Sequence, residues 1–165
     1  MTQKAHVGDV FLVPIEGSRS GIGQIAGNWK GELYIVIYDA VFEGENVDPK
    51  QVVGAKPLFA ALSLDAKIHH GDWRIIGNVT ENLAGIPQPV FKVNQDGAVF
   101  LESRDRSMTR PASGAEAEAL RLRTVVAPVR LEKALQAHNG VGDWNPRYDD
   151  LRYDYALESS RYAAA

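Results

Sequence analysis

The side chains best suited to chemistry in this 165-residue chain are its four histidines, two of which, His69 and His70, are adjacent. Imidazole and carboxylate groups are common metal ligands, and Asp72 follows the pair closely. Neighbouring residues of a strand point to opposite faces, so the pair cannot readily chelate one ion. The chain also contains no cysteine and therefore no thiolate ligand. We expect a surface turn here, with no metal and no cofactor.

Two further patterns associated with catalysis are incomplete. Residues 17–23, Gly-Ser-Arg-Ser-Gly-Ile-Gly, are superficially similar to a phosphate-cradling loop, but they lack the Lys-Ser/Thr ending and a following helix. No Gly-x-Ser-x-Gly sequence marks a nucleophilic serine, and no recognisable nucleophile adjoins a histidine. The sequence therefore predicts a hairpin here, with residues 16–21 as its connecting loop. It supports no catalytic residue, although it does not exclude an enzyme.

Carboxylates and aromatic side chains offer a different chemistry, the binding of another protein. One group of carboxylates lies close together in the sequence, at Asp39, Glu43, Glu45 and Asp48. Such a group is most often a solvated loop, and the alternative is a docking face for a basic partner. A second group, aromatic, lies near the C-terminus, at Trp144, Tyr148, Tyr153 and Tyr155. Hot spots of interfaces favour these side chains, although at helical spacing they more often pack inside a fold.

Length and composition indicate a single globular domain over residues 1–165. Hydrophobic residues make up 45% of the sequence and charged residues 24%, which is typical of a globular chain. No apolar run approaches the length of a membrane span, and residues 1–6 lack the apolar region of a secretory signal, so we expect a cytoplasmic location. The net charge of −3 removes the usual electrostatic basis for binding nucleic acid.

Residues 6–101 predict a succession of short strands with turns between them. Residues 10–15 are apolar on both faces, which indicates a strand covered on both sides, with Pro14 at its end or at an edge. Residues 32–42, rich in β-branched and aromatic side chains, predict a long central strand. We expect Trp73, on a strand over residues 72–78, to anchor the core. Residues 94–97 predict a hairpin turn.

In the last third of the chain, the pattern changes from short strands to a polar segment followed by helices. Residues 102–118 predict a polar loop, and alternating side chains favour a strand over residues 119–126, although Ser113 and Glu116 also fit a helical capping box. Residues 128–158 predict a helical part, with one helix over 128–138 and a shorter one over 146–157. The predicted fold class is α+β and mostly β: a strongly bent antiparallel sheet or SH3-like barrel with one or two C-terminal helices packed on it.

Five stretches together carry a resemblance to a known family. They are Gly8-Asp9-Val10-Phe11-Leu12-Val13-Pro14, Gly21-Ile22-Gly23-Gln24-Ile25, Tyr34-Ile35-Val36-Ile37-Tyr38-Asp39, Gly71-Asp72-Trp73-Arg74-Ile75-Ile76-Gly77 and Ile86-Pro87-Gln88-Pro89-Val90-Phe91. In this order and spacing they resemble the bacterial immunity protein 26 family over residues 6–93. The sequence after about Leu101 departs from the family.

The resemblance implies a non-catalytic protein, encoded beside a polymorphic toxin, that protects the producing cell by binding that toxin. The toxin would be an enzyme acting inside cells, for example a nuclease. The family supplies no catalytic residue. The positions that match it are expected to determine the fold, and they are Gly8, Asp9, Pro14, Gly23, Trp73, Gly77, Pro89 and Phe91.

An inhibitor of a lethal toxin must associate quickly, and electrostatic steering raises the association rate. The predicted toxin-facing surface is therefore acidic. Its residues are Glu43, Glu45 and Asp48, with Asp39 beside them, and Trp144 and Tyr148 are the alternative anchors.

Two alternative functions, from other classes of protein, are considered beside that of an immunity protein. A Gly-Asp pair before an apolar strand also opens PemK-type ribonuclease toxins, which would need a basic RNA groove and an arginine in the loop after the first strand. Arg19 occupies such a loop, but the Arg-Pro opening is missing and the net charge is negative. The other alternative is a small SH3-like binding or regulatory module without a toxin partner, because a fold does not dictate a function.

Overall fold

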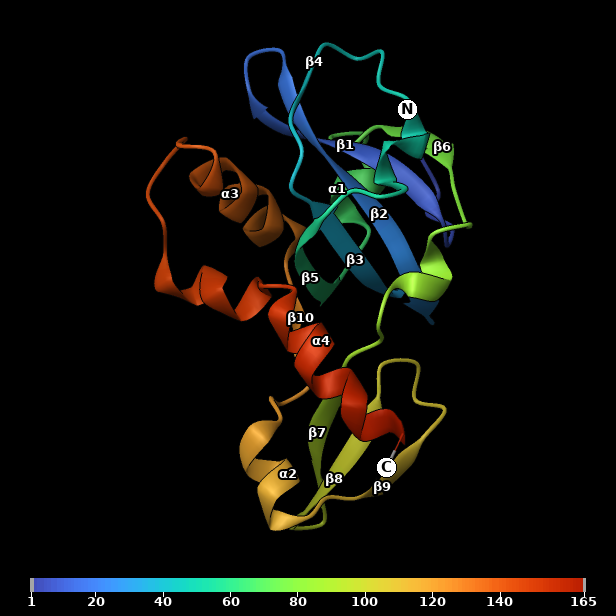
Figure 1. The fold of residues 1–165 in the computed structure, drawn as a ribbon, viewed down its shortest axis with the longest axis vertical. Helices are drawn as coiled ribbons and strands as arrows, with labels where there is room; N and C mark the ends of the chain where they lie inside the picture. Colours follow the sequence, from blue (N-terminus) through green and yellow to red (C-terminus); the bar gives the residue numbers. More distant parts are fainter. Residues whose placement is uncertain (1, 165) are drawn as a thin grey trace. The chain divides into compact units, whose positions relative to one another are not determined.

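The computed structural model describes residues 2–164, which group into two compact units. Unit 1 consists of Met1–Ile86 and Val125–Tyr153, and unit 2 of Pro87–Thr124 and Asp154–Ala165. Each unit has its own sheet (Figure 1). The sequence predicts a single domain over residues 1–165. Whether the two units fold together as one domain stays a prediction.

Unit 1 is built on a seven-stranded sheet with the order β10-β5-β3-β2-β1-β6, in which β4 also pairs with β2. Its strands are β1 (Asp9–Glu16), β2 (Arg19–Trp29), β3 (Glu32–Tyr38), β4 (Phe42–Glu43), β5 (Pro57–Ser63), β6 (Ile75–Asn78) and β10 (Val125–Val126). All pairs are antiparallel except β5 with β10. The fold is thus α+β and mostly β, as predicted.

The predicted strands of unit 1 are largely confirmed. In β1, Val10 and Leu12 on one face and Phe11 and Val13 on the other are all buried, so the strand is covered on both sides. The predicted hairpin is present, but its loop is only Gly17 and Ser18, because β1 extends to Glu16 and β2 begins at Arg19. The central strand β3 ends at Tyr38, earlier than predicted, because the chain turns where the backbone N–H of Asp39 bonds the carbonyl of Lys56 over 2.8 Å.

Short helices cover parts of this sheet. They are α1 (Ala66–His69), α3 (Pro128–His138) and the 3₁₀ helices η1 (Pro49–Val52), η2 (Leu83–Gly85) and η3 (Pro146–Leu151). The predicted helix over residues 128–138 is confirmed, and its residues Leu131, Ala134 and Leu135 join the core. Within residues 2–164, no helix is long and apolar enough to cross a membrane.

Trp73 is fully buried in this core. Its ring stacks on Phe11 with centroids 5.0 Å apart, and its Nε1 donates a hydrogen bond to Glu132 of α3 over 3.0 Å. Trp73 precedes β6, which begins at Ile75, so its predicted place on a strand over residues 72–78 is wrong. Its backbone N–H bonds the carbonyl of Lys67 in α1, which holds it in the turn between helix and strand.

The predicted second helix over residues 146–157 is divided in two. η3 ends at Leu151, and α4 (Asp154–Ser160) belongs to unit 2. Between them Arg152 is extended, with ψ 138°, and it pairs with Phe59 of β5. Pairing with the sheet therefore interrupts the helical pattern.

Unit 2 contains a three-stranded sheet in the order β7-β8-β9. Its elements are β7 (Val90–Gln95), β8 (Ala98–Ser103), β9 (Thr109–Pro111), α2 (Gly114–Ala119), α4 and η4 (Arg161–Ala164). The predicted hairpin turn is confirmed, with Asp96 and Gly97 in the left-handed region at φ 49° and 81°. These strands form a separate sheet, however, so the expectation of one sheet across residues 6–101 is wrong.

The region after β8 is more ordered than predicted. In place of a loop over residues 102–118, the chain forms the end of β8, β9 and α2. The capping box is present, because the Ser113 hydroxyl accepts from the N–H of Glu116 and the Glu116 carboxylate accepts from the N–H of Ser113. The helix ends at Ala119, the first residue of the predicted strand over residues 119–126. Of that strand, Val125–Val126 form β10, and Leu122 pairs with Lys92 in an isolated bridge.

Candidate partner-binding site

Several family-matching positions hold the chain around β1 and β6. Gly8 has φ 93°, in the left-handed region that favours glycine. The carboxylate of Asp9 accepts from the N–H of His6 over 2.8 Å and from the side-chain amide of Asn78 over 3.0 Å. Gly23 lies under Phe11, where an added Cβ would come within 2.6 Å of the ring. These contacts tie the start of β1 to the end of β6.

Gly77 positions the acidic loop. A Cβ at Gly77 would lie 2.6 Å from Cγ of Pro49, the first residue of η1. The missing side chain therefore lets η1, and the loop before it, pack directly on β6.

The remaining matching positions lie elsewhere. Pro14 is exposed, lies beyond the pairing of β1 with β6 and adjoins a β-bulge. In unit 2, the carbonyl of Pro89 accepts from the N–H of Arg104 over 3.1 Å. Phe91 is buried and stacks on Tyr155 with centroids 5.8 Å apart.

The acidic loop, residues 43–48, is held in place by its own carboxylates. Glu43 accepts from the hydroxyl of Ser18 over 2.6 Å, and Asp48 caps η1 by accepting from the N–H of Lys50 over 2.9 Å. The guanidinium of Arg74 donates to the backbone carbonyl of Glu45 over 3.2 Å and lies 3.8 Å from its carboxylate. The loop is thus a defined structure and carries exposed charge, since the side chain of Glu45 is 80% exposed.

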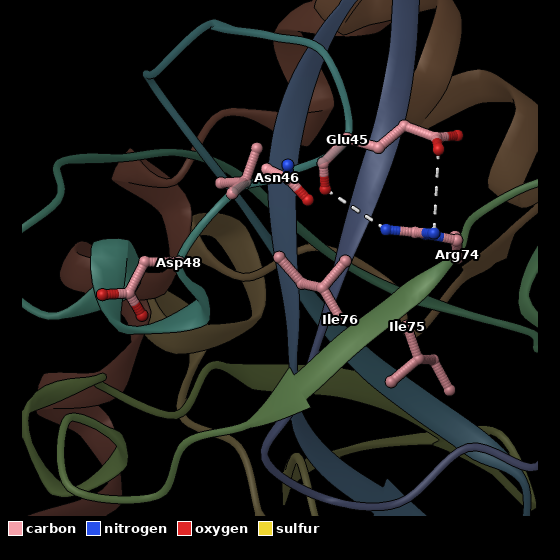
Figure 2. A pocket seen from close by; sticks show the side chains of 7 residues that line it. Glu45, Asn46, Asp48, Arg74, Ile75 and Ile76 are labelled. Atoms are coloured by element: carbon pink, nitrogen blue, oxygen red, sulfur yellow. Dashed lines mark hydrogen bonds and ion pairs between the residues drawn. The ribbon is translucent and has the colours of Figure 1, made fainter.

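An open hollow of about 560 Å³, the β6 hollow, lies between this loop and β6. Its lining residues are Glu45, Asn46, Val47, Asp48, Arg74, Ile75 and Ile76 (Figure 2). Figure 2 shows Arg74 directed at Glu45, and Ile75 and Ile76 leaving the strand in opposite directions. The structure therefore places Glu45 and Asp48 in one site, with Glu43 on the neighbouring β4.

Asp39 is not part of this hollow. Its carboxylate lies 3.2 Å from Nε2 of His138, at the end of α3. The aromatic candidates form a third group: Trp144 packs on Phe59 with centroids 6.1 Å apart, and Tyr148 meets Trp144 edge-on at 5.3 Å. Both rings are half-buried against the core, which gives them a packing role in unit 1.

The other chemical candidates are dispersed. His69 ends α1 and His70 follows it, with ring centroids 5.3 Å apart. Arg19 forms an ion pair with Glu16 over 3.2 Å at the β1–β2 turn. In the part of the chain that the structure describes, no group of three or more His, Asp or Glu residues could hold a metal ion.

Two polar groups around the sheet were not singled out from the sequence. Arg74 lies in a stretch whose pattern indicates only a strand, and its role depends on a loop about thirty residues earlier. The second is a buried network in which the amide oxygen of Gln24 accepts from the hydroxyl of Tyr38 over 2.7 Å and from Asn82 over 2.8 Å. Burial raises the pKa of Tyr38 to about 12, so it remains a neutral donor. The available sequence signal is that Gln24 shares a strand face with the apolar residues Ile22 and Ala26.

The family model described as Immunity protein 26 matches residues 6–99, which is more than half of the chain. The matched range includes every residue that lines the β6 hollow and excludes Trp144 and Tyr148. No curated protein and no solved structure matches this sequence.

Proposed function

We propose, on the premise that this chain belongs to the immunity protein 26 family, that it is a non-catalytic inhibitor which binds and neutralises a cognate bacterial toxin. It would act in the cytoplasm of the producing cell, against a toxin that is an enzyme working inside cells. The observation that carries this proposal is the family match over residues 6–99. Because the match contains the complete β6 hollow, we propose this hollow and the acidic loop as the toxin-facing surface.

The chemistry of this surface suits a basic partner. Glu43, Glu45 and Asp48 are all exposed, and the loop that carries them is fixed at both ends by hydrogen bonds. A preorganised acidic surface attracts a basic one and loses little conformational entropy on binding. Enzymes that cleave nucleic acids carry basic clefts, so a nuclease is the toxin that this surface fits best.

The proposal is tested by survival of cells that express the toxin domain encoded beside this chain. Cells that also express the chain should grow, and cells with an empty vector should not. A purified mixture should show one complex by size-exclusion chromatography. Growth arrest in spite of full expression of the chain, with no complex in the mixture, would contradict the proposed function.

The surface is tested separately by charge reversal. The double variant Glu43→Lys, Glu45→Lys should slow association with that toxin domain at least about tenfold at low salt, and less at high salt, because steering is screened. The matched control is Glu118→Lys, Glu158→Lys, which makes the same change in net charge at exposed positions of unit 2. Equal association rates for both variants would place the interface elsewhere, with Trp144 and Tyr148 as the next anchors to test.

A further inference from the structure

Sheet edges carry unpaired backbone groups that can bind another chain, and proteins commonly cover them. At one end of the unit 1 sheet, β5 is covered twice. The short strand β10 pairs with Leu62 and Ser63, and the N–H of Tyr153 bonds the carbonyl of Leu58 over 3.1 Å. This end is closed by segments of the chain itself.

The sheet of unit 2 is covered at β7. The N–H of Val90 donates to the hydroxyl of Ser159 over 3.1 Å, and the hydroxyl of Tyr155 donates to the carbonyl of Val90 over 2.7 Å. Further along, the N–H of Lys92 bonds the carbonyl of Arg121. The opposite strand, β9, has three residues and ends at Pro111, which has no N–H to donate.

The exposed part of β1 is also blocked. Beyond its pairing with β6, the strand contains Pro14, and the side chain of Gln136 donates to the carbonyl of Pro14 over 3.2 Å. A partner strand could therefore not pair regularly at this position.

The strand β6 is protected only at its first residue. It ends the seven-stranded sheet, and no strand among residues 2–164 pairs with it on the side away from β1. The side chain of Gln3 accepts from the N–H of Ile75 over 3.0 Å, at the first residue of the strand. Ile75, Ile76 and Gly77 are half-buried, and Asn78 is exposed. Beyond Ile75, therefore, the edge of β6 is open, and its two isoleucines border the β6 hollow.

We propose that an extended, basic segment of the toxin pairs with β6 and continues the seven-stranded sheet. This inference rests on the proposed function and specifies the mode of binding. Ile75 and Ile76 leave the strand in opposite directions and both line the β6 hollow (Figure 2), so a paired strand would find an apolar contact on each of its faces.

Charge complementarity indicates that this toxin segment carries basic residues. The exposed carboxylate of Glu45 stands above β6, where the guanidinium of Arg74 already lies 3.8 Å from it. The hollow is also lined by Asp48, so its two carboxylates outnumber its one cation, Arg74. A lysine or arginine of the toxin strand would meet Glu45 from the open side of the hollow, while main-chain hydrogen bonds to β6 supply affinity.

The test is hydrogen–deuterium exchange of the full chain with and without the toxin domain encoded beside it. Binding should slow exchange of amides within residues 75–78 at least about tenfold and leave those of Val125 and Val126 unchanged, because a paired edge protects its N–H groups. The variant Ile76→Lys should weaken binding at least tenfold. Leu64→Lys, which adds the same charge at a half-exposed residue after β5, should bind like the parent.

The outcomes separate the inference from the proposed function. If the parent binds the toxin domain but residues 75–78 keep their exchange rates and Ile76→Lys binds normally, strand pairing is wrong and the proposed function stands. If the parent does not bind at all, both are wrong.

Discussion

The two units are stabilised in different ways. Unit 1 has a broad apolar core in which Phe11, Ile35 and Trp73 are fully buried. Unit 2 has a small apolar core and, beside it, an ion pair between Glu102 and Arg123 whose side chains are only 7% and 6% exposed. Long strands buried on both faces supply enough apolar surface for unit 1, whereas the short sheet of unit 2 relies on charged groups as well. The stability of unit 1 should therefore depend on packing, and that of unit 2 on charge.

The largest effect is expected from removing the ring at the centre of unit 1. Trp73→Ala should lower the free energy of unfolding by about 3–5 kcal/mol, because a buried aromatic ring is replaced by a cavity. It also leaves the carboxylate of Glu132 without its indole donor. Urea unfolding followed by circular dichroism measures the change.

The control is Trp29→Ala, at the half-buried end of β2, where Lys30 lies over the indole at 5.2 Å. This change should cost under about 1 kcal/mol. Equal losses for both tryptophans would show that Trp73 is not the packing centre of unit 1.

In unit 2, the comparable change is Arg123→Met. The guanidinium of Arg123 donates to Glu102 over 2.8 Å and to the carbonyls of Ser103 and Arg104. Removing it leaves a buried carboxylate without its principal partner and should cost about 3 kcal/mol. Exchange rates of amides in β8 report the loss locally.

A double variant sharpens this result. Replacing both partners, as Glu102→Leu with Arg123→Met, removes the buried charge altogether and should be less destabilising than Arg123→Met alone. If the double variant is the less stable of the two, unit 2 is held by packing of the arginine and not by compensation of charge.

The smallest effect is a dependence of unit 2 on acid. Bonds from the guanidinium of Arg110, and from the N–H of Ser113, lower the pKa of Glu116 to about 2. A carboxyl whose folded pKa lies below its usual value of about 4.5 stabilises the fold above pH 4.5, and this contribution is lost as the pH falls towards 2. Hydrogen bonds from Ser107 likewise lower the pKa of Asp105 to about 2.

The matched variant is Glu116→Gln, which cannot lose a proton. Between pH 4.5 and 2 it should show a flatter decline in protection of the β8 amides than the parent, while amides of β3 respond equally in both proteins. The same decline in both proteins would mean that Glu116 does not set the acid stability of unit 2.

The difference between the units also explains what could be predicted from the sequence. In unit 1, local patterns and tertiary structure agree: continuous apolar runs became β1 and β3, and Pro128 with spaced leucines became α3. In unit 2, the alternation of Leu120 and Leu122 favoured a strand, yet the capping box from Ser113 starts a helix that ends at Ala119, and Leu122 pairs only in an isolated bridge with Lys92. Its separate sheet was not predictable, because β7 and β8 have no local signal that distinguishes pairing with β9 from pairing with β6.

The candidate site was predicted in part. Glu43, Glu45 and Asp48 were recognised as an exposed group from their density in a polar loop, and the structure describes them as exposed. Their hydrogen bonds were not foreseen, because Arg74 reaches the loop only through the packing of Pro49 on Gly77. The open edge of β6 depends on strand order, which sequence pattern does not specify.

The central proposal, that this chain neutralises a toxin by binding and not by catalysis, is tested most directly by calorimetric titration of the proposed toxin domain, followed by intact-mass measurement of both chains. We predict heat that saturates at a one-to-one ratio and unchanged masses of both proteins. A change in the mass of the toxin produced by a small fraction of an equivalent of this chain, or the absence of saturable heat, would contradict the claim.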